Sequence, residues 1–236
     1  MGTGCQRFSE GCHNCYMFLA QSRVPWGHPP EIRRCKPSTW KHPITWQKKA
    51  AKAGELKSVF ACSYSDFFLP AADAWDLIRQ TPNLIWRLVT KRRHLIADRL
   101  PPDWGNGYEN VWLGTSLELK KYLSRLDDLR QIPCVLRWAE LSPVLEDLMP
   151  ELADHVEGIG WINASGETGC NRVEPRRLDL QWARNIRDLC KEKNIPFRFS
   201  HVSGRERYPD RHLDGVIYNG VPPPMLKSEK TSQEAA

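Results

Sequence analysis

Six short apolar stretches recur along the chain, and a polar segment and then a helical pattern follow most of them. They occupy residues 58–62, 84–89, 111–115, 134–139, 158–163 and 196–200. The sequences between them predict helices at 71–80, 92–99, 119–131, 143–153 and 176–193. Strands that alternate with helices pair in parallel, so we expect an α/β fold whose sheet is either doubly wound or curled into a barrel.

The domain organisation follows from this alternation. Upstream of it, helices are expected at 16–23 and from Ser38 or Thr39 to about Ala53, where Gly54 would stop the helix. Residues 1–220 are predicted to form a single α/β domain, for which a chain of 236 residues is long enough. Residues 221–236 are rich in proline and then polar and charged, which predicts a disordered tail.

The composition excludes several classes of protein. The sequence contains no run of about 18 apolar residues, so we expect no membrane-spanning helix. Its first residues lack the basic stretch and apolar core of a secretion signal. A core of this size is stable without disulfides, so the eight cysteines are expected to be reduced and the protein cytoplasmic.

Three of the eight cysteines crowd into the first fifteen residues, where Cys5, Cys12 and Cys15 form a C-x6-C-x2-C pattern. The C-x2-C pair lets two thiolates converge on a metal across a tight turn. Gly4 and Gly11, which precede two of these cysteines, give the backbone room to wrap closely around a centre. The pattern therefore predicts a metal centre. The remaining cysteines, which we expect to be buried and inert, are at 35, 62, 134, 170 and 190.

Two kinds of metal centre fit this pattern. Zinc takes four ligands, and His13, His28 or Cys35 would supply the fourth. A [4Fe–4S] cluster usually has four thiolates as well, but a cluster held by three leaves one iron open to a substrate or cofactor. The lack of a second C-x2-C pair favours the open cluster, and Cys35 keeps the closed site as an alternative.

Polar residues follow every predicted strand. In parallel α/β folds, the loops at the carboxyl ends of the strands build the active site. The residues at these positions are Ser63, Ser65 and Asp66; Thr90, Lys91 and Arg92; Thr115, Ser116 and Glu118; Arg137 and Glu140; Ser165, Gly166 and Glu167; and Ser200 and His201. These ends converge on one mouth, and we take Lys91 and Glu140 as the candidate catalytic residues there.

Simpler roles for some of these residues stay open. Asp66 and Glu140 are each also compatible with a carboxylate at the start of a helix. The basic run Lys91–Arg93 is also compatible with a solvated charged segment. For His201, a lone histidine, a structural role is favoured.

Six motifs in a fixed order resemble those of a known family. They are Gly4-Cys5 with Gly11-Cys12-His13-Asn14-Cys15-Tyr16, Cys62-Ser-Tyr-Ser-Asp-Phe-Phe68, Leu88-Val-Thr-Lys-Arg92, Val111-Trp-Leu-Gly-Thr-Ser-Leu-Glu118, Arg137-Trp-Ala-Glu-Leu-Ser-Pro143 and Ile162-Asn-Ala-Ser-Gly-Glu167. The chain resembles the phage-associated three-Cys-motif proteins (phage Gp37/Gp68-like), a family of unknown function that is similar to radical S-adenosylmethionine (SAM) enzymes. The resemblance runs from Gly4 to about Gly204.

The resemblance implies a fold and a chemistry. The fold would be a partial TIM-like (β/α) barrel, with an N-terminal iron–sulfur cluster loop at 4–16 in which Cys5, Cys12 and Cys15 hold a [4Fe–4S] cluster. The open iron would bind SAM, and an electron from the cluster would cleave it to a 5′-deoxyadenosyl radical. By position, the residues implied to contact SAM are Asp66 near the amino group, Ser116 and Glu118 at the ribose, Gly166 and Glu167 on the far side, and Lys91 and Arg92 at the carboxylate or at a substrate phosphate.

The sequence departs from the radical SAM pattern in three places. The common cysteine spacing there is C-x3-C-x2-C, so the loop is longer here. Relatives carry a Trp-rich strand before the first cysteine, whereas four residues precede Cys5 here. Either the start codon is misassigned or the first strand is missing, and a missing strand would leave an open sheet edge beside the cluster. Where relatives tend to have Gly-Gly-Glu-Ser-Gly, this chain has Ser165-Gly166-Glu167-Thr168-Gly169.

The charge pattern bears on partners. The net charge is +6, and basic residues cluster beside some of the ten tryptophans, among them Trp26, Trp40, Trp46 and Trp104. Basic and aromatic residues together suit a nucleic acid or nucleotide; the alternative is that the cations are solvated and the tryptophans form core.

The leading hypothesis is a radical SAM-type enzyme acting on a nucleic-acid base or nucleotide, with a flavodoxin or ferredoxin as electron donor. The alternative is a zinc-stapled, non-enzymatic module that binds nucleic acid or protein.

Overall fold

The computed structural model of this chain describes residues 2–20, 32–69, 74–168, 173–204 and 210–222. Its core is a parallel sheet of six strands in the order β3-β4-β5-β6-β7-β8. The strands are β3 (Lys57–Phe60), β4 (Leu84–Thr90), β5 (Val111–Leu117), β6 (Leu136–Leu141), β7 (Trp161–Ala164) and β8 (Phe197–Phe199). Each predicted apolar stretch contributes one strand, with small shifts at its ends.

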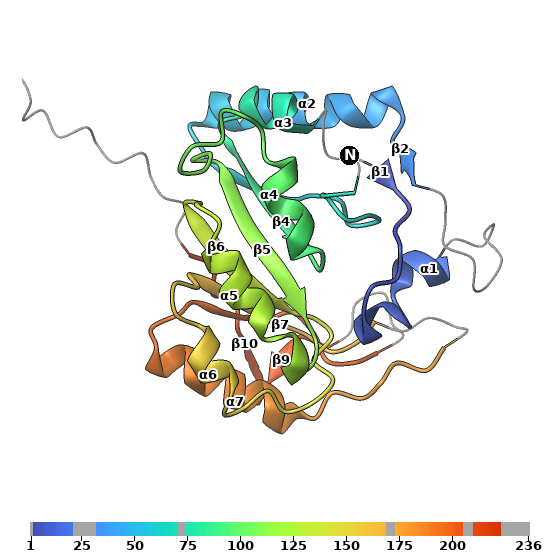
Figure 1. The fold of residues 1–236 in the computed structure, drawn as a ribbon, viewed down its shortest axis with the longest axis vertical. Coiled ribbons are helices and arrows are strands. Elements are labelled where there is room, and N and C mark those ends of the chain that lie inside the picture. The colour runs from blue at the N-terminus through green and yellow to red at the C-terminus, as the bar shows by residue number, and fades with distance from the viewer. Residues whose placement is uncertain (1, 21–31, 70–73, 169–172, 205–209, 223–236) are drawn as a thin grey trace, which may run out of the picture.

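The sheet is curled into a half-barrel, with β3 and β8 as its two outermost strands (Figure 1). Of the two expected architectures, the curled sheet is therefore confirmed, and it is compatible with a partial TIM-like fold. The backbone of residues 218–220 bonds to the free edge of β8, through Phe199 N to Tyr218 O and Gly220 N to Phe197 O, both at 2.9 Å. Within the described residues no strand pairs with the outer edge of β3.

Helices cover the convex face of the sheet (Figure 1). They are α2 (Pro37–Ala53), α3 (Ala74–Arg79), α4 (Ile96–Arg99), α5 (Ser124–Arg130), α6 (Leu152–His155) and α7 (Leu180–Glu192). Helices α2, α3 and α4 pack on the β3–β4 end, α5 packs on β5 and β6 in the middle, and α6 and α7 cover the β6–β8 end. No described helix has the length and apolar character that crossing a membrane requires.

The start of α2 differs slightly from the expectation, and its end agrees. Pro37 stands in the first helical turn, where its missing N–H costs nothing, so the helix begins before Ser38 and Thr39. Gly54 ends the helix in the left-handed conformation, at a φ of 65°. The short helix predicted at 16–23 is α1 (Tyr16–Ala20), and residues 21–23 lie outside the described chain.

The helix predicted at 143–153 is wrong, because most of this segment is not helical. The amides that would start the helix are used by neighbouring strand ends: Val144 N donates to Ser165 O at 2.9 Å, and Leu145 N donates to Glu118 O at 3.1 Å. Pro143 and Pro150 have no N–H to continue a helical ladder. Only the last turn forms, as α6.

Helix α7 begins at Leu180, four residues later than predicted. The Asp179 carboxylate caps it by accepting a hydrogen bond from Gln181 N at 2.8 Å. The preceding residues bind the mouth of the half-barrel instead, since Arg176 N donates to the Glu167 carboxylate. On the inner face of α7, Ile186 and Leu189 are buried against the sheet.

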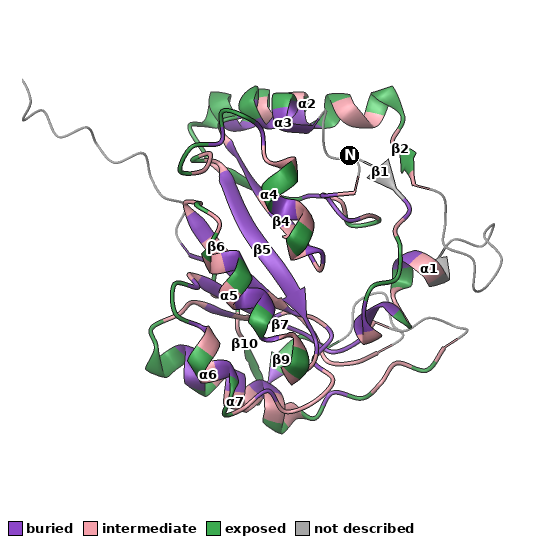
Figure 2. Cartoon of the chain, viewed as in Figure 1, coloured by how far each residue is buried: buried purple, intermediate pink, exposed green. Residues whose placement is uncertain are grey.

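Three tryptophans from strands of the buried sheet (purple in Figure 2) form an aromatic floor on the concave face of the half-barrel. Trp112, Trp138 and Trp161 are all at most 2% exposed and pack together there. The Trp138 ring lies directly on the backbone of Gly114, where an added Cβ would be 2.5 Å from the indole. This packing closes the floor, so solvent reaches the half-barrel from the carboxyl ends and the open side.

Two small antiparallel pairs complete the fold. β1 (Gly2–Thr3) pairs with β2 (Arg33–Arg34), and β9 (His212–Leu213) pairs with β10 (Val216–Ile217). Trp161 Nε1 donates to Gly220 O at 2.8 Å, so the last described residues pack on the sheet. Of the predicted tail at 221–236, residues 223–236 lie outside the described chain.

Candidate functional site

The segment 4–16, which carries the three clustered cysteines, runs across the carboxyl ends of the sheet strands (Figure 1). We call it the cysteine segment. Gly4 is bonded to the loop after β3, with Ser65 Oγ donating to Gly4 O at 2.7 Å. Gly11 N donates to Glu118 Oε1, after β5, at 2.9 Å. Contacts with several separate strand ends therefore hold the segment over the mouth.

The opposite end of the segment is also fixed. Asn14 Nδ2 donates to Glu167 Oε2, after β7, at 2.9 Å. The Glu10 carboxylate accepts a hydrogen bond from the Tyr122 hydroxyl at 2.6 Å and pairs with Lys121. The segment thus spans the mouth from β3 to β7 as a strap.

The three cysteine sulfurs are grouped on this strap. Cys12 is buried, and Cys5 and Cys15 are half-buried. Burial raises the pKa of the Cys5 thiol to about 11; the Arg92 charge opposes this, while Asp66, Cys12 and Cys15 add to it. Burial also raises the pKa of Cys15, again with a contribution from Cys12. The thiols therefore lie close enough to influence one another's ionisation.

Cys35 directly follows β2 and is half-buried. In the antiparallel pair of β1 and β2, Thr3 lies opposite Arg33 and Gly2 lies opposite Arg34. The alternative in which Cys35 closes the metal site stays a prediction.

The other proposed fourth ligands are His13 and His28. His13 is exposed, and His28 lies outside the described residues. Among the residues that the structure describes, no three His, Cys, Asp or Glu side chains are arranged to hold a single metal ion. A zinc ion would draw each sulfur to about 2.3 Å, so the described chain does not present a preformed zinc site.

The remaining cysteines differ in burial. Cys190 is buried, and burial raises its pKa to about 12. Cys62 and Cys134 are half-buried, and burial raises the pKa of Cys134 to about 11. The expected burial is therefore confirmed for Cys190, whereas Cys35, Cys62 and Cys134 are only half-buried and Cys170 lies outside the described residues.

Glu118 is the main anchor of the strap. Its side chain is fully buried and binds Lys91 Nζ at 2.8 Å, Arg125 Nη1 at 3.4 Å and the amide of Gly11. Burial would raise the pKa of Glu118, but the Lys91 charge and these hydrogen bonds hold it below its usual value. An added Cβ on Gly11 would lie 3.1 Å from Glu118 Cδ, so glycine permits this close approach, in line with the expectation for Gly11.

Glu167 anchors the far side of the mouth. It is 4% exposed, and besides Asn14 it binds Arg176 through the backbone amide at 2.8 Å and through the guanidinium. Gly166 precedes it, and an added Cβ there would lie 2.2 Å from Ser203 N. The glycine is therefore required by the approach of the loop that follows β8.

Asp66 holds the near side. It is 6% exposed and accepts hydrogen bonds from Thr90 Oγ1 at 2.8 Å, Phe68 N at 3.0 Å and Arg92 Nη1 at 3.1 Å. The same Arg92 nitrogen approaches Cys5 Sγ at 3.8 Å. Asp66 therefore positions the arginine that faces the first cysteine, and its bond to Phe68 N is a local turn rather than the cap of a helix.

Lys91, Ser116 and Glu140 lie in a polar layer above the aromatic floor. Lys91 Nζ donates to Ser116 Oγ at 3.1 Å, and Glu140 Oε1 accepts a hydrogen bond from Asn163 Nδ2 at 2.6 Å. Burial raises the pKa of Glu140 to about 7. A carboxyl group with this pKa exchanges a proton near neutral pH, which is the property of a general acid or base.

The structure decides between several roles left open by the sequence. Glu140 lies within strand β6 and does not start a helix. Of the basic run, Lys91 and Arg92 point into the mouth, whereas Arg93 pairs with Asp128 outside it. His201 is half-buried, and its Nδ1 lies 2.8 Å from Val202 O, which agrees with a structural role.

Three residues of the polar layer were not among the predicted site residues. Asn163 links Glu140 to Ser200, whose Oγ donates to Asn163 Oδ1 at 2.7 Å. Arg87 and Arg198 also turn onto the concave face, where both act electrostatically on Glu140. Strand alternation could have identified Arg87. It is the one charged residue in Leu84–Thr90, and alternate side chains of a strand point to the same face of the sheet, so Arg87 occupies an inward position.

Most tryptophans of the described chain are core residues. Trp75, Trp86, Trp104, Trp112, Trp138 and Trp161 are buried. Trp46 is 42% exposed, and Trp26 lies outside the described residues. For these buried rings the packing alternative holds, and they do not offer a stacking surface to nucleic acid.

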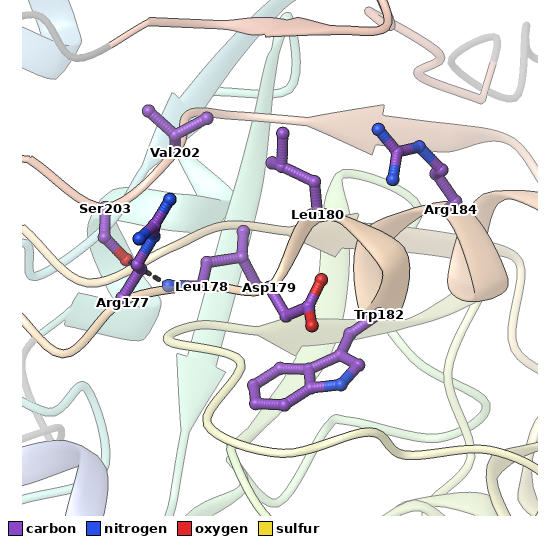
Figure 3. Close-up of a pocket in the computed structure, with 8 residues that line it drawn as sticks. All are labelled: Arg177, Leu178, Asp179, Leu180, Trp182, Arg184, Val202 and Ser203. Carbon is purple, nitrogen blue, oxygen red and sulfur yellow. Dashed lines mark hydrogen bonds between the residues drawn. The ribbon is translucent and has the colours of Figure 1, made fainter.

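A hollow of about 720 Å³ borders the site at the start of α7 (Figure 3). Arg177, Trp182 and Arg184 line it together with Val202 and Ser203. The dashed bond in Figure 3 joins Leu178 N to Ser203 Oγ at 3.0 Å. No predicted site residue is part of its lining, so it is separate from the mouth under the strap.

A protein-family comparison places the chain. The family model described as "Protein of unknown function (DUF5131)" matches residues 2–222. The chain belongs to the DUF5131 family. The match spans the cysteine segment and all six strands, in agreement with the expectation of an uncharacterised family. Comparisons with curated proteins and with solved structures find no match.

Proposed function

We propose that this DUF5131 protein is a radical SAM-type enzyme that modifies or repairs a nucleic-acid base or nucleotide. Cys5, Cys12 and Cys15 would hold a [4Fe–4S] cluster. The observation that carries the proposal is the grouping of these three thiols over the carboxyl ends of a parallel half-barrel. Active sites of parallel α/β folds lie at this edge.

The donor set is compatible with a cluster. The irons of a [4Fe–4S] cluster occupy separate corners of a cube, so its thiolates stand apart instead of converging on one point. The thiols of Cys5, Cys12 and Cys15 lie near enough to influence one another's pKa, as the ligands of one cluster would. The Arg92 guanidinium beside Cys5 would offset part of the negative charge of a thiolate cluster.

When bound, such a cluster supplies the electron that cleaves SAM and so starts radical chemistry on a substrate. An electron carrier such as flavodoxin or ferredoxin would deliver that electron. Asp66, Ser116, Glu118, Gly166 and Glu167 are the proposed SAM-side residues. In the described structure most of them already bond to the cysteine segment or to residues that hold it, so their first role is to position the strap.

Lys91 and Glu140 are the proposed proton-handling pair. Glu140 holds or releases a proton near neutral pH, because burial raises its pKa to about 7. Lys91 donates to Ser116 and Glu118, which fixes its ammonium group above the polar layer. Glu140 can therefore exchange a proton with a bound substrate on the concave face.

Anaerobic reconstitution with iron and sulfide tests the cluster. The purified chain is expected to gain iron, acid-labile sulfide and brown cluster absorbance. Cys5→Ala, Cys12→Ala and Cys15→Ala should each lose most of it, whereas Cys134→Ala and Cys35→Ala should keep it. Cluster absorbance that survives all three substitutions would overturn the ligand set, and loss in Cys35→Ala would favour a closed four-thiolate site.

A second measurement tests SAM chemistry separately. The reconstituted protein, reduced with dithionite, is expected to convert SAM to 5′-deoxyadenosine. A protein with a full cluster that forms no 5′-deoxyadenosine would refute the SAM-dependent part and leave an electron-transfer or structural cluster.

A further inference from the structure

Two arginines lie on the concave side of the half-barrel and influence each other electrostatically. Arg87 comes from β4, near one end of the sheet, and Arg198 comes from β8, at the other end. The Arg87 guanidinium lies 5.7 Å from the Phe60 ring centre and 5.5 Å from that of Trp161. Arg198 is in register with Asn163, which is in register with Glu140, so it belongs to the polar layer.

Neither arginine has an anionic partner within ion-pair distance in the described part of the chain. The Nε atoms of Arg87 and Arg198 are both buried and lack a hydrogen-bond partner there. Burial lowers the pKa of Arg87, and the charge of Arg198 lowers it further. The pKa of Arg198 is lowered by burial and by the nearby charge of Arg211. Arg198 thus lies within electrostatic range of two other cations, Arg87 and Arg211.

Glu140 does not neutralise them. Its carboxylate bonds to Asn163, and neither guanidinium approaches within 4 Å of it, so an Arg–Glu–Arg ion-pair triad is not formed. Burial raises the pKa of Glu140 to about 7, so at neutral pH it carries only part of a negative charge. Buried cations in proteins are ordinarily paired, and unpaired buried donors cost folding free energy. The concave face therefore has a surplus of positive charge and of unused donors.

We propose that Arg87 and Arg198 form an anion subsite on the concave face of the half-barrel that binds a phosphate group. A guanidinium presents its donors as a planar fork that matches a phosphate with two parallel hydrogen bonds. Two forks from opposite arms of the half-barrel meet around one tetrahedral, doubly charged group. The ring contacts to Phe60 and Trp161 orient the Arg87 fork in advance.

This subsite goes beyond the proposed function, because it assigns a phosphate-bearing ligand to the concave face of the sheet. In the described structure neither arginine bonds to the cysteine segment. It holds whether or not a cluster binds. Binding to a chain with Cys5, Cys12 and Cys15 all replaced by alanine therefore separates it from the cluster: this variant is expected to bind phosphate like the wild type.

Arginine side-chain NMR on the ¹⁵N-labelled full chain, titrated with inorganic phosphate, tests the subsite directly. The Nε–H signals of Arg87 and Arg198 are expected to shift together and to saturate. Single Arg→Lys substitutions, Arg87→Lys and Arg198→Lys, assign the two signals. If saturating phosphate moves neither signal, the proposal is wrong.

Calorimetry on matched variants provides the second readout. Arg87→Met and Arg198→Met should each weaken phosphate binding by roughly 10- to 100-fold, the effect of losing a charge-assisted contact. Arg184→Met is the control, since Arg184 pairs with Asp214 on the outer surface, and it should leave binding unchanged. Equal phosphate affinity in Arg87→Met, Arg198→Met and the wild type would overturn the subsite. Should a Met variant fail to fold, the wild-type NMR titration decides alone.

Discussion

The Glu118 anchor under the cysteine segment offers the sharpest test of the site. Replacing Glu118 by glutamine keeps the shape and one acceptor oxygen but removes the charge. Lys91 and Arg125, whose side chains are 16% and 1% exposed, then lose their anionic partner in a buried setting. Breaking a buried ion pair by removing one partner costs about 3–5 kcal/mol. Because the amide oxygen still accepts one bond, we expect a loss of about 3 kcal/mol.

For a chain of this size, each 1 kcal/mol lowers the melting temperature by about 2–4 °C, so Glu118→Gln should melt about 6–12 °C below the wild type. Urea unfolding followed by circular dichroism gives the free energy, and hydrogen exchange of the Gly11 amide should become faster because its carboxylate acceptor is weakened. Since the folded pKa of Glu118 is lowered, its stabilisation is complete above its ordinary pKa of 4.5 and is lost as the pH falls through the lower folded value. The gap between the two proteins should therefore shrink in acid.

Glu151→Gln is the matched control. Glu151 pairs with Lys120 on the surface, where the two side chains are 49% and 34% exposed. Such exposed pairs contribute about 1 kcal/mol or less. If Glu118→Gln unfolds within about 1 kcal/mol of the wild type and of this control, Glu118 is not the buried anchor described above.

Three further substitutions test other contacts. Gly166→Ala places a methyl group 2.2 Å from Ser203 N, a clash with backbone that should cost about 3 kcal/mol or more in urea unfolding; an unchanged midpoint would contradict the close approach of the two loops. Gly114→Ala places its methyl group 2.5 Å from the Trp138 ring, so about 1–3 kcal/mol of stability should be lost and tryptophan fluorescence should change; a native spectrum at full stability would rule out this packing. Glu140→Gln should stabilise the protein more at a pH of about 8 than at about 4, because a pKa raised from 4.5 to about 7 means that ionising Glu140 opposes folding as the pH rises. The difference in the free energy of unfolding is at most about 3 kcal/mol. If the stabilities of the two proteins run parallel in pH, Glu140 is not desolvated.

Periodicity was sufficient for the strands and for most helices. Each stretch such as 111–115 is apolar over several residues because its strand is covered on both faces, by helices outside and by the tryptophan floor or polar layer inside. The error at 143–153 has a tertiary cause: the amides of Val144 and Leu145 bond to the ends of β7 and β5. Local sequence does not contain the position of those acceptors.

The site residues show the same division. Position at strand ends was enough to select Asp66, Glu118 and Glu167, because parallel strands bring their carboxyl ends to one edge. Their partners were not predictable, since Gly11 and Glu118 are 107 residues apart in the chain. Arg87 and Arg198 were missed as a pair because their proximity depends on how strongly the sheet curls.

By itself, then, the sequence determined the parallel α/β class, the positions of the six strand-forming apolar segments along the chain and the C-x6-C-x2-C group at residues 5–15. Hydrophobic periods and cysteine spacing are local properties, and they persist in any fold the chain adopts. Only the tertiary structure decided that the sheet is a half-barrel and that the cysteine segment is strapped across its mouth. These features depend on strand curvature, register and buried charge pairing between distant residues, which form only when the whole chain packs.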